Sequence, residues 1–222
     1  MTFKNFLLIL LTVSFLMPSV IQAQEEAVED WELRIEKDQI KVFNKKNHKT
    51  GIKEIRITTT IMATIPELIK ILNDVSLYNT WVYKCKSAKK IKSISSNSFQ
   101  YYLQTDFPFP TSDRDLVIES KQWSDAQSGY YYSHSVAKSD LLPVKAGIVR
   151  IKTFESFWKI MPNEDGSVDI DYRAFTDPGG NIPAWIINMG ITQGPLKTFQ
   201  KCIELVEQPT TESVDIGLDI RN

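Results

Sequence analysis

The stretch FTDPGGNIPAWIINMG, residues 175–190, determines how the rest of the sequence is interpreted. No charged side chain occurs from Pro178 to Leu196, although 24% of the whole chain is charged. Between Ile182 and Val206, apolar residues recur at intervals of three or four positions, with one gap. This spacing predicts a final amphipathic helix of about 24 residues. Its first half is apolar nearly all round, and its second half carries lysines and glutamates on one side.

Glycine and proline divide this helix in two. Gly190, Gly194 and Pro195 lie in its middle, and a proline lacks the N–H donor that its turn requires, so we expect a kink or break near residue 194. The same residues and two asparagines exclude a membrane span. The preceding DPGG segment, Asp177–Gly180, either turns a strand into the helix or belongs to a hinge that lets the apolar half lift. The apolar half must be covered by protein or must itself cover something apolar.

The sequence before the helix alternates apolar and polar residues in short runs. Residues 31–46 read as two strands joined by a turn at Lys37–Asp38, and residues 53–62 read as a third strand. Alternation returns in five further runs between residues 98 and 175, which Pro, Gly, Asn and Asp separate. We therefore expect one antiparallel sheet of eight or nine strands, connected mostly by hairpins.

A different period occurs between the third and fourth strands. Thr64 is a candidate N-cap, Pro66 suits the first helical turn, and residues 74–81 read as a short second helix or turn. The predicted class is therefore α+β, with two small helices between strands 3 and 4 and a curved sheet wrapped around the long final helix. Such a wrap leaves space between sheet and helix.

Length and composition predict one folded domain. The 222 residues, 42% of them hydrophobic, suffice for one substantial core. We expect a signal peptide at residues 1–23, a ligand-binding domain at 24–207 and a flexible polar tail at 208–222. No internal repeat or low-complexity linker interrupts the middle segment.

The first 23 residues have the three parts of a secretory signal. Lys4 precedes an apolar run from Phe6 to Met17, and the small residue Ala23 precedes an acidic segment. We expect cleavage after Ala23 and a periplasmic or secreted protein. An uncleaved anchor is the alternative, but this run is short for a span, which requires about 20 apolar residues.

Charge and cysteine content exclude several partners. The net charge is −1 for the whole chain, so we expect no nucleic acid partner. The densest basic run, Lys84 to Lys92, is either a solvated face or a phosphate-binding track. Cys85 and Cys202 form either one disulfide bond or two buried free thiols, and neither has a metal-ligand spacing. We expect no metal and no cofactor.

This order of elements resembles the START family of steroidogenic-acute-regulatory-related lipid transfer domains, within the helix-grip superfamily. Five segments in the same order carry the resemblance, which spans about residues 30 to 207. They are WELRIEKDQIKVFNKK (31–46), IPELIKILNDVSLYNTW (65–81), FPFPTSDRDLVI (107–118), FESFWKIMPNEDGSVDIDYRAFTDPGGNIPAWIIN (154–188) and the final helix.

The resemblance implies a protein that binds, and in the family transfers, a single lipid or other hydrophobic ligand. The ligand would lie in an enclosed cavity between sheet and final helix, and transient membrane contact by a monomer would be compatible with this role. Aromatic residues are plentiful in the strands, and alternation sends half of them inward. The predicted ligand-binding residues are Tyr102, His134, Phe157, Tyr172, Trp185, Ile186 and Met189. A register error of one residue would move every strand choice to the other side of the sheet.

Two positions bear on the resemblance. Asp113-Arg114-Asp115 matches the family's Arg-Asp at a strand start, and we expect two carboxylates flanking one guanidinium as a structural anchor. Several family members hold a charged pair in the cavity, but Ser120 stands where the basic member is expected. The departure indicates a ligand held by shape and hydroxyl contacts.

Two other functions remain open from the sequence. A cyclase or aromatase could use the same fold, with His134, Asp171 or Tyr172 moving protons. Export argues against it, because polyketide intermediates are made on carrier proteins in the cytoplasm. An interaction module whose exposed apolar half-helix docks on a partner is the third candidate. We expect no catalytic residue and no enzymatic activity.

Overall fold

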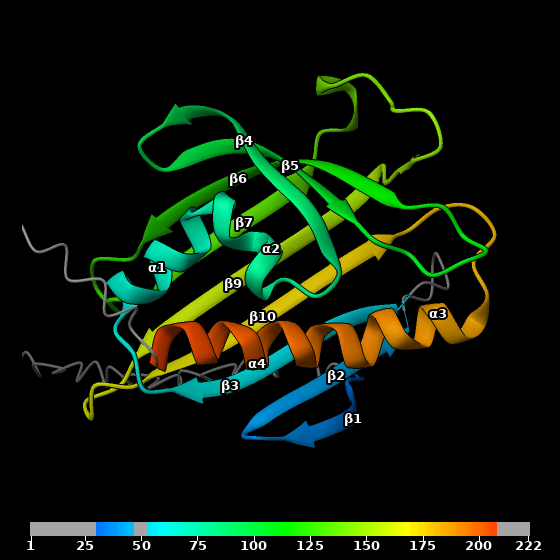
Figure 1. Cartoon of the computed structure of the whole chain (residues 1–222). Helices are drawn as coiled ribbons and strands as arrows, with labels where there is room; N and C mark the ends of the chain where they lie inside the picture. The colour runs from blue at the N-terminus through cyan, green and yellow to red at the C-terminus, as the bar shows by residue number, and fades with distance from the viewer. Residues whose placement is uncertain (1–29, 47–52, 208–222) are drawn as a thin grey trace, which may run out of the picture. The chain divides into compact units, whose positions relative to one another are not determined.

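A computed structural model describes residues 30–46 and 53–207 (Figure 1). The predicted signal peptide at 1–23 and the predicted tail at 208–222 lie outside the described residues. Within them, no helix is both long enough and apolar enough to cross a membrane.

The described chain forms one ten-stranded sheet, in the order β1-β2-β3-β10-β9-β7-β6-β5-β4, with β8 attached to β6. Neighbours along this order are antiparallel, and only the short β8 pairs in parallel. The strands are β1 (Glu32–Lys37), β2 (Ile40–Lys46), β3 (Lys53–Ile61), β4 (Cys85–Ser95), β5 (Ser98–Thr105), β6 (Arg114–Ser124), β7 (Tyr131–Ala137), β8 (Val149–Arg150), β9 (Thr153–Pro162) and β10 (Val168–Asp177). The predicted antiparallel sheet is confirmed, with β4 and β8 as additions.

Two small helices connect β3 to β4, as the sequence predicted. They are α1 (Ile65–Asn73) and α2 (Tyr78–Trp81), with a short 3₁₀ turn, η1 (Val75–Leu77), between them. Helix α1 begins where Thr64 donates its backbone N–H and its hydroxyl to the Glu67 carboxylate. This contact closes the first turn and holds the pKa of Glu67 below its ordinary value.

The final helix is continuous but changes its winding in the middle (Figure 1). It consists of α3 (Ala184–Asn188), a π-helical segment η3 (Met189–Gln193) and α4 (Gly194–Glu207). The predicted disturbance near residue 194 is therefore a wide π turn rather than a break. Because Pro195 has no N–H to donate to the preceding turn, local widening is one way to accommodate it.

Alternation along the strands gives the sheet two different sides. We call the side that carries Ile57, Trp158 and Ile160 the helix-facing side, because these residues share one buried cluster with Leu68 of α1 and Phe199 of α4. In Figure 1 the helices lie in front of this side and the strands curve around them. The opposite side is called the outer side below.

Candidate functional site

Helix α4 packs closely against the middle of the helix-facing side. The Phe199 ring stacks on Trp158 with centroids 5.2 Å apart and lies 5.6 Å from the Tyr172 ring. Trp158 and Tyr172, which are paired across β9 and β10, are themselves 4.7 Å apart. This half of the final helix therefore rests on a filled aromatic layer.

Small side chains replace the aromatic layer two residues further along the strands. Ser120, Ser135 and Ser156 are register neighbours across β6, β7 and β9, and Ala174 of β10 is next in the same row. We call these four buried residues the small row. Alternate residues of a strand are about 7 Å apart, so the small row lies one layer from Trp158 and Tyr172. Short side chains there leave more room above the sheet than the neighbouring rings do.

Hydroxyl groups surround the small row. Ser135 and Ser156 act on the Tyr101 and Tyr172 phenols respectively, because each serine lowers the pKa of its phenol against the larger effect of burial. Burial raises the pKa of Tyr172 to about 12 and raises the pKa of Tyr101 further. Both phenols therefore stay neutral and offer hydrogen bonds without bringing a charge.

Two further buried hydroxyls lie on the helix-facing side without a protein partner in the described part of the chain. They are the Tyr131 phenol and the Thr59 Oγ1, which lie in one row on either side of Ile160 and Ile170. A buried hydroxyl without a partner costs free energy, so these positions suit a water or a polar ligand atom.

The predicted helical residues have three different placements. Ile186 of α3 is buried, with 3% of its surface exposed, whereas Trp185 is 54% exposed. The side chain of Met189 lies outside the described residues. Of the predicted strand residues, Tyr172 is on the helix-facing side and contacts α4 through Phe199. Whether any of them binds a ligand stays a prediction.

Tyr102, His134 and Phe157 lie on the outer side, which revises the predicted lining. The Lys145 ammonium covers the Tyr102 ring at 4.1 Å, and His134 Nε2 is 2.7 Å from Glu155 Oε1. Phe157 belongs to an aromatic group with Trp123 and Tyr132 on the same side. The cause is the register: on β5, β7 and β9 the residue adjacent to each predicted one faces the helices.

Sequence reasoning missed Tyr101, Ser135 and Ser156 for the same reason. On β5, β7 and β9 aromatic residues occur at both even and odd positions, so hydrophobicity alone does not identify the inner set. A usable signal was the pair of serines at alternate positions of β7, Ser133 and Ser135. Both lie on the same side of the strand and both are buried.

The Asp113-Arg114-Asp115 prediction is wrong in its pairing. Asp113 accepts hydrogen bonds from Lys86 and Gln104, which lower its pKa. The Arg114 guanidinium donates to the backbone carbonyls of Pro178 and Gly179. Alternation sends Arg114 and Asp115 to opposite sides of β6, so the two carboxylates cannot flank one guanidinium. Arg114 instead fastens the turn that precedes α3.

Asp115 forms a buried ion pair with Arg150. Arg150 Nε and Nη2 lie 2.6 and 3.1 Å from the two carboxylate oxygens, and the side chains are 2% and 0% exposed, respectively. The same guanidinium donates to the carbonyls of Ser139, Leu142 and Pro143. One arginine therefore fixes the 138–148 segment onto the outer side of β6.

The remaining reactive groups do not converge. Cys85 and Cys202 are free thiols, and burial raises the pKa of Cys202 to about 12. Across the described ranges no cluster of three or more His, Cys, Asp or Glu could hold a metal ion. The residues suggested for proton transfer are also apart, since His134 and Asp171 are on the outer side and Tyr172 faces the helices. Asp171 is bound by Arg56 at 2.7 and 3.0 Å.

Comparisons with known proteins agree on one family. A family model described as the START domain matches residues 16–212. An uncharacterised protein of Pseudomonas aeruginosa is 28% identical over 172 residues, covering 78% of this chain and 84% of its own. The phosphatidylcholine transfer protein of Rattus norvegicus is 25% identical over 172 residues, covering 74% of this chain and 78% of its own.

Solved structures give the same fold. A STAR-related lipid transfer protein of Xanthomonas axonopodis (fragment 25–204) superposes with a TM-score of 0.74 at 26% identity, covering 80% of this chain and 99% of its own. Human StAR-related lipid transfer protein 5 superposes with a TM-score of 0.71 at 17% identity, covering 84% of this chain and 90% of its own. The second likeness is one of fold alone.

Proposed function

The chain belongs to the START domain family, and on that premise we propose that it binds one lipid or other hydrophobic molecule between the sheet and the final helix. The observation that carries the proposal is the small row on the helix-facing side of the sheet, next to an aromatic layer that α4 fills. We further propose that the protein carries the ligand between membranes or to another protein.

Binding at this place requires no charged group. Removing apolar surface from water contributes about 25 cal/mol per Å², so a ligand that buries a few hundred square ångströms gains several kcal/mol before entropy losses. The neutral phenols of Tyr101 and Tyr172 and the serine hydroxyls supply polar contacts. Ser120 stands where the resemblance led us to expect a basic residue, and its hydroxyl bonds to Ser133 with their oxygens 3.2 Å apart, which places hydroxyl groups there.

Binding is favoured over catalysis. In the cyclase or aromatase alternative, His134, Asp171 or Tyr172 would move protons. His134 and Asp171 lie on the outer side, bound to Glu155 and Arg56, and Tyr172 alone faces the helices, where it packs against Trp158 and Phe199. The proposal therefore assigns no proton transfer and no covalent step to this chain. It also includes export with cleavage after Ala23 and a monomeric state, which the mass of the purified native protein would test.

The experiment is extraction of protein purified from a bacterial host, followed by mass spectrometry of the organic phase. We expect one lipid per protein chain. Protein that comes out empty, and that after delipidation binds no fatty acid, sterol or phosphatidylcholine, would overturn the proposal.

A matched pair of variants locates the site. Ala174→Leu adds volume to the small row without removing a hydrogen bond, and Val136→Leu adds less volume on the outer side of β7. If the row borders ligand space, Ala174→Leu stays folded and loses lipid while Val136→Leu keeps it. If the space is already filled, overpacking makes Ala174→Leu unstable by about 1–3 kcal/mol, and urea unfolding separates these outcomes.

A further inference from the structure

The charge along the chain is strongly uneven in one place. From Val75 to Thr105 there is no acidic residue, but there are five lysines, in a protein whose net charge is −1. Most of this segment is the β4–β5 hairpin, which forms the terminal pair of the sheet. The turn η1 and helix α2 contact β4 (Figure 1).

Three of the lysines have no carboxylate partner among the described residues. Lys84 and Lys86, near the start of β4, pair with Asp106 and Asp113 at 3.1 and 2.9 Å. Lys89, Lys90 and Lys92 lie further along the strand without an ion pair in the described ranges, and all three are exposed. The positive charge of this half of β4 is therefore uncompensated.

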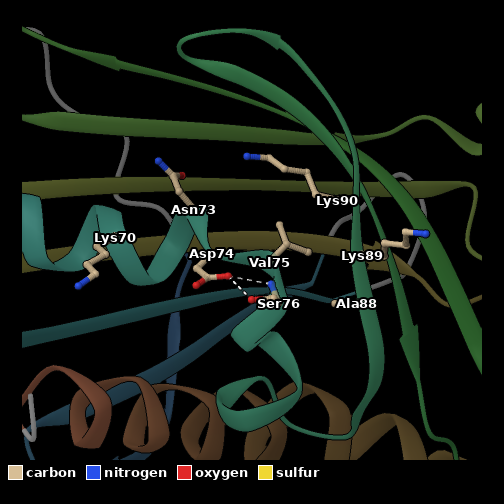
Figure 2. A pocket seen from close by; sticks show the side chains of 8 residues that line it. All are labelled: Lys70, Asn73, Asp74, Val75, Ser76, Ala88, Lys89 and Lys90. Carbon is tan, nitrogen blue, oxygen red and sulfur yellow. Dashed lines mark hydrogen bonds between the residues drawn. The ribbon is translucent and has the colours of Figure 1, made fainter. Parts of the chain in front are cut away.

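An open groove of about 660 Å³ lies between this strand and α1. Its lining comprises Lys70, Asn73, Asp74, Val75, Ser76, Ala88, Lys89 and Lys90. In Figure 2 the Lys90 side chain extends toward Asn73, which lies on the opposite side of the groove. The Asp74 carboxylate, the one acid in the lining, already accepts from the backbone N–H and the hydroxyl of Ser76.

Apolar side chains accompany the lysines on the same strand. Ile91 and Ile94 are 36% and 49% exposed. Ile91 lies between Lys90 and Lys92, and Ile94 lies two residues beyond Lys92, so this end of β4 exposes both cationic and apolar side chains. Such a combination matches the boundary of an anionic bilayer, where phosphates meet acyl chains.

We propose that Lys70, Lys89, Lys90 and Lys92, with Ile91 and Ile94, form a docking surface for anionic membranes, and that the groove takes the phosphate of one headgroup. The proposal rests on the proposed function, because a protein that carries lipid must meet a bilayer. Each lysine near an anionic surface contributes about 1 kcal/mol, so four are enough for reversible attachment.

Protection of the sheet edge is the competing explanation for these lysines. Terminal strands commonly carry charges that prevent pairing with other chains, and β4 is terminal. Edge protection would account for lysines on β4 itself, but it does not account for the absence of acidic residues from the rest of the segment from Val75 to Thr105, which is not an edge strand.

Vesicle flotation tests the proposal on the full chain. Phosphatidylcholine vesicles are compared with vesicles that also contain phosphatidylglycerol. Lys89→Gln/Lys90→Gln/Lys92→Gln is compared with Lys37→Gln/Lys46→Gln/Lys152→Gln, which removes the same charge from exposed positions elsewhere. We expect the natural chain to bind only the anionic vesicles and to lose this binding at high salt. The affinity should fall on the order of a hundredfold in the first variant and should be retained in the second.

Each other outcome overturns the docking surface. Equal loss of binding in both variants would indicate that only net charge matters. If the natural chain binds no vesicles, an acidic protein would be the better candidate partner for this surface. Self-association of the first variant without loss of vesicle binding would support edge protection. Lipid bound by each variant is measured on the same samples. A protein that keeps its lipid but ignores anionic vesicles refutes this inference and leaves the proposed function standing.

Discussion

Asp115 and Arg150 have no role in the proposed lipid site, but they are the most deeply buried ionic contact described here. The carboxylate raises the pKa of Arg150 through a direct hydrogen bond. Asp115→Asn would leave a buried guanidinium without its counter-charge, which costs about 3–5 kcal/mol. We expect a correspondingly lower urea midpoint. Asp113→Asn is the control, because its partner Lys86 is largely exposed, and equal shifts in the two variants would contradict the argument.

Burial of titratable groups predicts loss of stability in alkali. Burial raises the pKa of Cys202 from 9.0 and of Tyr172 from 10.0, each to about 12. The folded state therefore holds these protons more tightly than the unfolded state, and the stability is fully present below pH 9 and lost as pH rises through 12. For Cys202 the loss is on the order of 4 kcal/mol.

Urea unfolding under reducing conditions at a series of pH values measures this loss. Cys202→Ala lowers stability at neutral pH by leaving a small cavity, so the comparison is between slopes and not between absolute values. We expect a shallower decline above pH 9 in the variant. If the free energy of unfolding falls with pH at the same rate in Cys202→Ala and in the natural chain, the Cys202 thiol does not contribute to the loss of stability in alkali.

Among the elements, α3 depends most on a contact outside itself. It has five residues, too few to be stable alone, and Arg114 fastens the turn before it by donating to Gly179 O at 3.2 Å. The Arg114 side chain also stacks on Phe107, 4.6 Å from the ring centre. Arg114→Lys keeps the charge but loses the planar fork. We expect roughly tenfold faster amide exchange in α3.

Exchange in α4 and β10 serves as the internal reference, and Arg56→Lys on the outer side is the matched variant. Unchanged exchange in α3 would mean that Arg114 does not hold the turn. Faster exchange throughout the protein would mean global destabilisation instead.

The elements also show where sequence patterns stop being informative. Helix α1 was predictable because Thr64, Pro66 and Glu67 are local signals. Strand β4 was not, because it is terminal, all of its residues are exposed or half-buried, and its lysines and serines show no alternation. The π-helical segment follows from Pro195 only in the sense that some distortion was required, and its form depends on packing.

At the scale of the whole molecule, the order of elements was predictable and the inner surface was not. Five segments in sequence order identified the fold, because each is long and its spacing to the next is restricted. Tyr102, His134 and Phe157 were placed on the wrong side because one residue of register inverts a strand. The prediction of Ile186 depended on the helical period of 3.6 residues, which is less sensitive to an error of one residue. The Ile186 side chain is buried.

The inner surface also determines how stability should respond to ligand. A ligand bound only by the folded state stabilises it by RT ln(1 + [L]/Kd), about 2.7 kcal/mol at a hundred times Kd. For a chain of this size we expect delipidation to lower the melting temperature by several degrees, and returning the extracted lipid to restore it. Ala174→Leu should melt at the same temperature with and without lipid, whereas Val136→Leu should respond like the natural chain. A delipidated natural chain that melts unchanged would mean that α3 and the small row are already in contact, with no space between them for a ligand.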